Sequence, residues 1–78
     1  FNPTTTINYT VASGNLTSIV NLSVFDVLGR KVATIVNKEQ TPGNYSVRFD
    51  ASRFSSGIYF YKLSSGNIVK IRKMLLVK

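Results

Sequence analysis

Apolar and polar residues alternate along most of the chain, as they do in β-strands that bury one face. Near the start, Ile7, Tyr9 and Val11 alternate with Thr and Asn. No segment shows a convincing 3.6-residue period, so helices are not expected. The predicted strands cover residues 4–11, 18–25, 31–36, 44–51, 58–64 and 67–78.

Turn-forming residues separate these strands at intervals of about ten residues, the spacing of a sandwich. Pro42-Gly43 sets the turn chemistry of a polar loop at residues 37–44, and Ser65-Gly66-Asn67 predicts a tight hairpin turn. We therefore predict an all-β fold, an immunoglobulin-like antiparallel β-sandwich of about six to seven strands, with a small barrel as the alternative. The 78 residues predict a single domain, residues 1–78.

Two predicted strands are apolar on both parities. For residues 31–36 this pattern predicts a strand that is covered on both faces. Within residues 58–64, Lys62 shares its parity with Phe60, so the other set is predicted to face the core. That set is Tyr59, Tyr61 and Leu63.

The last strand begins with alternating apolar and basic residues and then becomes uniformly apolar. A bulge near Lys73 would switch the buried face. Without a bulge, Met74 and Leu76 would face outward beside the basic residues, and the pattern leaves both arrangements open. The basic residues of this strand are Lys70, Arg72, Lys73 and Lys78.

The segment "VFDVLGRKVATIV" predicts a hairpin whose tip carries Val27 and Leu28, where turns usually place polar residues. Asp26 is expected to accept an Asx-turn hydrogen bond, and Gly29 to supply positive φ. The favoured interpretation is that the two apolar side chains cap the open end of the sandwich, so that Leu28→Ala destabilises the fold. The alternative is an exposed docking contact.

Composition argues against catalysis and metal binding. The chain has no His and no Cys, so it lacks the commonest general base, a thiol nucleophile and the usual zinc ligands. Its three carboxylates, Asp26, Glu39 and Asp50, are scattered and suit turns or solvent. We expect no enzyme activity, no metal and no cofactor.

The charge of +7 is concentrated toward the end, where residues 62–78 carry five basic residues and no acid. This suits an acidic partner, nucleic acid or an anionic surface, and equally a solvated strand. A nucleic-acid module would stack bases on Tyr59 or Tyr61 over a cationic groove. An adhesive or carbohydrate-binding module would need a row of exposed aromatic residues, and no clear row is visible outside the predicted core.

Five stretches in order, "FNPTTTINY", "VFDVLGRKVATIVN", "PGNYSVRFDAS", "SSGIYFYKLSSG" and "KMLLVK", resemble the C-terminal sorting domains of proteins exported by the type IX (Por) secretion system of Bacteroidetes. The resemblance implies a folded, non-catalytic export signal behind a larger cargo, and a chain that opens without Met fits such a fragment. The implied partners are the upstream cargo and outer-membrane components, including a shuttle protein and a sortase-like protease. Neither nucleic-acid binding nor membrane insertion is expected.

The same resemblance implies transit through the periplasm to the cell surface or the medium, with removal of the domain on export. The family often separates the Pro and Gly that are adjacent here at Pro42-Gly43. Its motif and turn positions correspond to Asp26, Leu28, Gly29, Arg30, Pro42, Gly43, Tyr45, Gly57 and Tyr59. We predict that the machinery recognises an apolar and basic ribbon made by Lys70, Lys73, Met74, Leu76 and Lys78.

Overall fold

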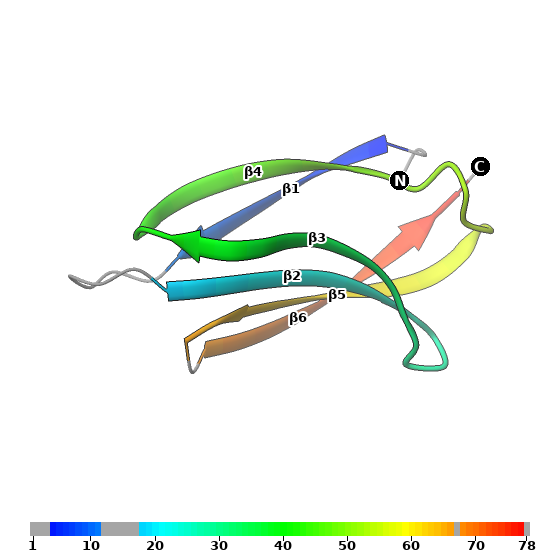
Figure 1. The fold of residues 1–78 in the computed structure, drawn as a ribbon. Helices are drawn as coiled ribbons and strands as arrows, with labels where there is room; N and C mark the ends of the chain where they lie inside the picture. Colours follow the sequence, from blue (N-terminus) through cyan, green and yellow to red (C-terminus); the bar gives the residue numbers. More distant parts are fainter. Residues whose placement is uncertain (1–3, 12–17, 67, 78) are drawn as a thin grey trace.

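The alternating apolar residues bring two antiparallel sheets face to face in the computed structural model, which describes residues 4–11, 18–66 and 68–77 (Figure 1). The narrow sheet has the order β1-β4 and the wide sheet has the order β3-β2-β5-β6. This confirms the predicted all-β sandwich of the immunoglobulin-like kind. The strands are β1 (Thr4–Val11), β2 (Ser18–Asp26), β3 (Lys31–Gln40), β4 (Gly43–Asp50), β5 (Gly57–Ser65) and β6 (Ile68–Leu76).

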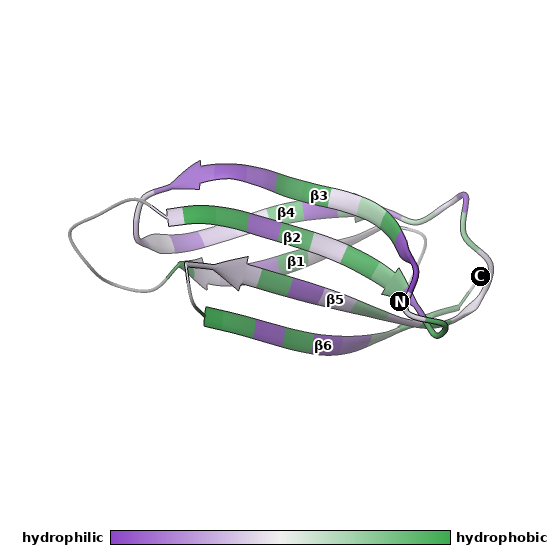
Figure 2. Ribbon diagram, turned by 60° about the horizontal axis from the view of Figure 1, so that its bottom comes forward, coloured by the Kyte–Doolittle hydropathy of each residue, from purple (hydrophilic) through white to green (hydrophobic). Residues whose placement is uncertain are grey.

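One apolar core lies between the sheets. Val20, Leu22 and Val24 of the central strand β2 are fully buried, and each such side chain contributes about 1.5–3 kcal/mol of transfer free energy. Figure 2 shows the alternation of apolar and polar residues along the strands that produces this one-sided burial. The other buried apolar residues are Ile7, Tyr9, Val11, Val36, Phe49, Ala51, Leu63, Met74 and Leu76.

Strand β3 has apolar residues on both parities because bulges interrupt its pairing with β2. Val32 and Ile35 have no partner residue on β2, and the register shifts at both places. Each shift resets the alternation, so both side chains turn toward the core while Thr34 stays exposed. The prediction that this strand is covered on both faces is therefore wrong.

The polar loop predicted at residues 37–44 is also shorter than expected. Residues 37–40 continue β3 and pair with residues 18–21 of β2, which leaves only Thr41 and Pro42 between β3 and β4. The end of β3 is an exposed part of an edge strand, so polar side chains are compatible with strand pairing there. Because residues 37–40 show no alternation of apolar and polar residues, the sequence pattern did not predict that the strand continues through them.

The predicted orientation of β5 is confirmed. Leu63 is buried, and Tyr59 and Tyr61 are half-buried against the core. On the other parity, Ile58 is exposed and Phe60 is half-buried. The position of Lys62 therefore identified the inner face of this strand correctly.

Both arrangements considered for the last strand are wrong. Strand β6 pairs with β5 without a register shift, from Gly57↔Leu76 to Ser65↔Ile68, so there is no bulge near Lys73. Met74 and Leu76 are nevertheless buried. They lie at the end of β6 beside Tyr59, whose ring contacts that of Phe54, a residue of the loop that follows β4.

Lys70 and Arg72 share the parity of Met74 and Leu76 but are exposed. One face of β6 thus changes from open and basic to buried and apolar along its length. The apolar residues of the opposite face are left in solvent, and they include Val69 and Ile71, which are 53% and 62% exposed.

This assignment predicts opposite effects of two substitutions in β6. Leu76→Ala should lower the free energy of unfolding by about 2–5 kcal/mol, because it empties a buried site, whereas Ile71→Ala should change it by no more than about 0.5 kcal/mol. Urea denaturation measures both values. Equal losses, or a larger loss for Ile71→Ala, would contradict the assignment.

Candidate recognition surface

The hairpin loop between β2 and β3 is held by one carboxylate. Oδ1 of Asp26 accepts hydrogen bonds from the N–H groups of Leu28 (2.9 Å) and Arg30 (3.0 Å). Oδ2 accepts a hydrogen bond of 2.8 Å from Nε of Arg30. Gly29, at φ +83°, donates its N–H to the Asp26 carbonyl at 3.0 Å. The predicted Asx turn and positive φ are both confirmed.

The tip of this loop points into solvent. Val27 is 63% exposed and Leu28 is 74% exposed. The expectation that they cap the sandwich is wrong, because the hydrogen bonds to Asp26 fix the backbone in a shape that holds both side chains outward. Leu28→Ala is therefore no longer expected to destabilise the fold, since truncation of so exposed a side chain changes the free energy of unfolding by no more than about 0.5 kcal/mol.

The exposed tip continues into the outer side of the wide sheet. A shallow hollow of about 290 Å³ lies between the loop and β5 and β6, and its lining includes Val27, Phe25, Phe60, Lys62 and Ile71. The register places Phe25, Phe60 and Lys73 side by side on three neighbouring strands. We call this surface the outer apolar face; it consists of Phe25, Val27, Leu28, Ile58, Phe60, Lys62, Val69, Ile71, Lys73 and Leu75.

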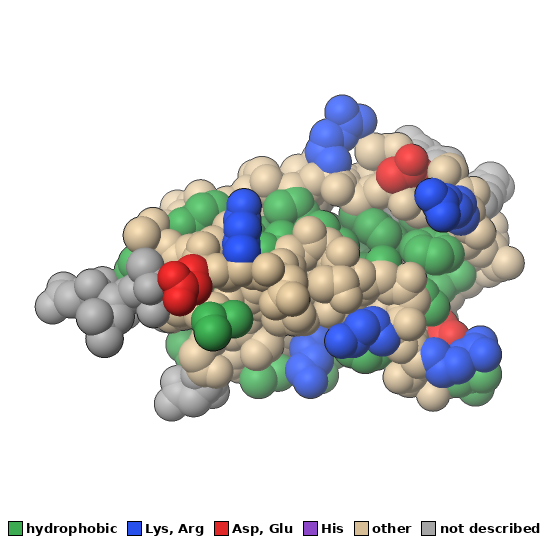
Figure 3. Space-filling model, viewed as in Figure 1, with side chains coloured by type: hydrophobic (Ala, Val, Ile, Leu, Met, Phe, Trp, Pro, Cys, Tyr) green, Lys and Arg blue, Asp and Glu red, His purple; other side chains and the backbone are tan. Residues whose placement is uncertain are grey.

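The charges on and around the outer apolar face are mainly positive. Lys62 and Lys73 lie on it, and Nζ of Lys31 is 6.0 Å from the centre of the Phe25 ring, within range of a cation–π contact. The neighbouring acid, Asp26, is engaged by Arg30. Figure 3 shows Lys and Arg side chains in the upper and lower parts of the view, with acidic groups beside some of them.

The residues predicted to contact the machinery fall into two groups in the structure, buried and exposed. Met74 and Leu76 are core residues, whereas Lys70 and Lys73 are exposed on opposite faces of β6. Lys78 lies outside the described residues. The prediction missed Ile71 as an exposed residue, although its place between Lys70 and Arg72 on an edge strand is a signal that could have found it.

Two tyrosines of the family motif clamp loops onto strands. The Tyr45 hydroxyl donates to the carbonyl of Thr41 at 2.5 Å, and the Tyr59 hydroxyl donates to the carbonyl of Ser55 at 2.7 Å. Both bonds span four residues, as in the tyrosine corner of immunoglobulin-like domains. Each tyrosine lies two residues after a glycine, Gly43 or Gly57, so these hydrogen bonds give the tyrosine of each Gly-x-Tyr segment a structural role.

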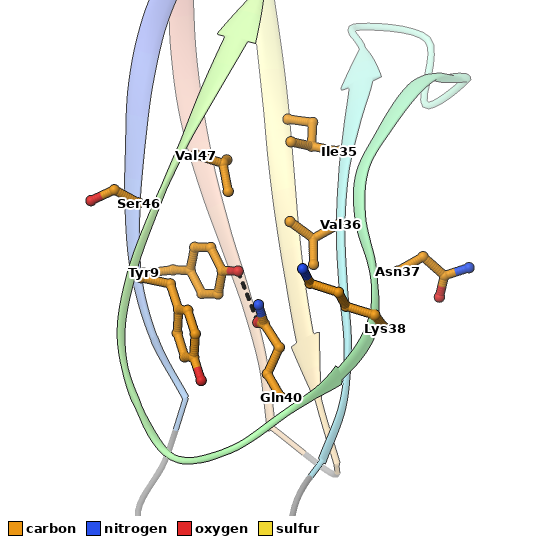
Figure 4. A pocket seen from close by; sticks show the side chains of 9 residues that line it. Tyr9, Ile35, Val36, Asn37, Lys38, Gln40, Ser46 and Val47 are labelled. Atoms are coloured by element: carbon orange, nitrogen blue, oxygen red, sulfur yellow. Dashed lines mark hydrogen bonds between the residues drawn. The ribbon is translucent and has the colours of Figure 1, made fainter.

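On the side of the sandwich where β3 and β4 end the sheets, a cleft of about 380 Å³ opens between them (Figure 4). The Tyr9 hydroxyl donates to Oε1 of Gln40 at 2.8 Å, which joins the two sheets. The Tyr9 and Tyr45 rings stack with their centres 5.5 Å apart. Apolar residues such as Val36 and Val47 share the lining with Lys38, and no acid lies among them.

Nothing in the described ranges brings three potential metal ligands together. Exposed apolar surface rimmed by polar groups, such as the outer apolar face, is typical of interaction sites. The family comparison agrees: residues 2–78 match the model of the secretion system C-terminal sorting domain, and the chain belongs to this family. It is therefore a sorting domain of the type IX secretion system, a family of export signals rather than of known enzymes. No curated protein and no solved structure matches the chain.

Membership of this family implies an interaction with the secretion machinery, a fused upstream cargo, and export to the cell surface or the extracellular space. Among the residues that the structure describes, no helix is long and apolar enough to cross a membrane.

The tyrosine clamp leads to a measurable difference within β5. Tyr59→Phe should lower the free energy of unfolding by about 0.5–1.5 kcal/mol through loss of the bond to Ser55. Tyr61→Phe is the control, because the Tyr61 hydroxyl makes no hydrogen bond within the described residues. Thermal denaturation distinguishes the two; equal stability of both variants and the parent would contradict the clamp.

The hairpin loop predicts an acid-sensitive stability. The hydrogen bond from the Arg30 N–H, followed by those from the Arg30 side chain and the Leu28 N–H, outweighs desolvation and lowers the pKa of Asp26 below its ordinary 3.8. The Ser52 N–H likewise lowers the pKa of Asp50. A lowered folded-state pKa stabilises the fold above the unfolded value, and this contribution disappears as pH falls through the folded-state pKa.

Melting temperature should therefore drop as pH falls below about 4, near the unfolded value of an Asp carboxyl. Asp26→Asn should be less stable than the parent at pH 7 and lose part of the dependence on pH. Glu39→Gln is the control and should show the same dependence of melting temperature on pH as the parent, because the Glu39 carboxylate makes no hydrogen bond or ion pair in the described part of the chain. An unchanged profile for Asp26→Asn would contradict the role given to this carboxylate.

Proposed function

We propose that this domain is a non-catalytic export label, which outer-membrane components of the type IX machinery read in its folded state to carry an upstream cargo across the outer membrane. The observation that carries the proposal is the outer apolar face. Val69, Ile71 and Leu75 are each more than half exposed, and continuous exposed apolar surface rimmed by polar groups is typical of interaction sites.

The contact we propose is made by side chains of β6 and the hairpin tip. The bonds of Asp26 already fix Val27 and Leu28, so little conformational entropy is lost when a partner covers them. Lys62 and Lys73 speed the encounter with an acidic partner. The far edge of β6 adjoins no other strand of the described chain, so a partner strand can pair along it as well.

In this proposal the predicted recognition residues have different tasks. Lys73 contacts the partner, while Met74 and Leu76 act indirectly by anchoring β6 to the core. Lys78 stays a predicted contact. The partners we propose are a shuttle protein at the outer membrane and a sortase-like protease that removes the domain, so the cargo passes through the periplasm to the cell surface or the medium.

An export assay tests the label. Residues 1–78 are fused behind a periplasm-directed fluorescent reporter in a bacterium with a working type IX system and in a secretion-deficient strain. Reporter should appear outside only the working strain. Reporter retained in the periplasm of both strains, with the domain shown to be folded, would contradict the proposed function.

Variants in the same assay test the surface. Ile71→Asp should reduce the exported fraction about tenfold, since a charge in a desolvated apolar contact costs at least about 1.4 kcal/mol. Thr6→Asp, at an exposed position on the narrow sheet, is the matched control and should export normally. Melting temperatures exclude unfolding as the cause. Normal export of a folded Ile71→Asp domain would show that the outer apolar face is not the surface that is read.

A further inference from the structure

The narrow sheet leaves one side of the sandwich open. Within the described chain, strand β1 pairs only with β4, and β6 pairs only with β5. Between the free edges of β1 and β6 lies a groove of about 180 Å³. Figure 1 shows β1 behind β4, on the side of the narrow sheet away from the viewer. The groove is lined by Asn8, Tyr9 and Thr10 of β1, Tyr61 and Leu63 of β5, and Lys70 and Arg72 of β6.

Two basic side chains occupy the side of β6 that a complete sandwich would bury. Lys70 is paired with Leu63 and Arg72 with Tyr61, so both lie on the inner parity of the wide sheet. Both are exposed, and neither has an ion-pair partner among residues 4–11, 18–66 and 68–77. The groove therefore carries uncompensated positive charge in the place of a missing core layer.

The free edge of β1, beside Lys70 and Arg72, can pair with an added β-strand. Main-chain groups along an edge strand pair readily with an incoming strand. A strand added to β1 would widen the narrow sheet and lie over the inner face of β6. Side chains on one face of that strand repeat every second residue, about 6.6–6.8 Å apart. Lys70 and Arg72 are also separated by two residues on one strand.

We propose that this groove binds an extended segment of a partner protein, with acidic side chains at alternate positions i and i+2 that pair with Lys70 and Arg72 while its main chain pairs with β1. The site is separate from the outer apolar face, which lies on the other side of the wide sheet. The proposal therefore stands on the groove alone and does not depend on the proposed export function.

Two alternative roles of the groove lead to different binding behaviour. Charges that point inward from an edge strand also prevent edge-to-edge association of sheets, and in that case no peptide binds. A cationic groove lined by a half-buried tyrosine also suits single-stranded nucleic acid, which would stack a base on Tyr61. Neither alternative predicts that the groove prefers a peptide with acidic residues at alternate positions, whereas the proposal does.

The test uses the purified chain of residues 1–78 and two fluorescein-labelled eight-residue peptides of Thr, Val and two Glu. One peptide has its Glu residues at i and i+2, and its isomer has them at i and i+1. Fluorescence anisotropy at 0.05 M salt should show at least tenfold tighter binding of the alternating peptide. Hydrogen exchange should show that the bound peptide protects amides of β1.

Charge reversal tests the pairing. Lys70→Glu/Arg72→Glu should weaken binding of the alternating Glu peptide at least tenfold and create binding of the same peptide with Lys in place of Glu. Lys62→Glu/Lys73→Glu changes net charge equally on the other face of the wide sheet and should leave binding unchanged. Circular dichroism confirms that both variants are folded.

Three outcomes would overturn the proposal. Binding of neither peptide would leave Lys70 and Arg72 with the protective role only. Equal loss in both double variants would reduce the effect to net charge. Tighter binding of a single-stranded oligonucleotide than of the alternating peptide, lost in the Lys70→Glu/Arg72→Glu variant, would assign the groove to nucleic acid.

Discussion

One-sided burial of the wide sheet is the constraint on which the rest of the structure depends. The chain has no cysteine to form a disulfide, so a small core between the sheets must stabilise it. The fully buried side chains of β2 lie at the centre of that core. Because the narrow sheet covers only part of the wide one, the inner face of β6 is buried at one end and open at the other.

The residues that stabilise the fold differ from the exposed residues to which we assign recognition. Asp26, Gly29 and Arg30 close a loop, and Tyr45 and Tyr59 clamp two others. These motif positions are therefore explained by folding. The exposed apolar residues of β6 and the hairpin tip make no comparable contribution to the core, and exposed apolar surface of this kind is typical of interaction sites.

Much of the fold was predictable because period-2 alternation reports one-sided burial directly. Lys62 was enough to orient β5, and Asp26 with Gly29 was enough to place the hairpin turn. Prediction failed where the alternation no longer reports burial. In β3 the bulges at Val32 and Ile35 reset it, and in β6 the cover above one face ends partway along the strand.

The candidate surface was predictable only in part. The sequence locates the basic and apolar residues of the last strand, but which of them face solvent depends on how far the narrow sheet and the loop carrying Phe54 extend over β6. Likewise, the apolar character of Val27 and Leu28 is visible in the sequence. Their direction depends on the hydrogen bonds that Asp26 makes to the loop, which a pattern of residue types does not report.

In the function that we propose, the exporting machinery reads the outer apolar face of the folded domain. Photo-crosslinking in cells with a working type IX system tests it most directly, with a photoreactive amino acid placed at position 71 on that face or at position 46 on the exposed side of the narrow sheet. We expect an adduct with an outer-membrane component from position 71 and none from position 46. Adducts of equal yield from both positions, or from position 46 alone, would contradict it.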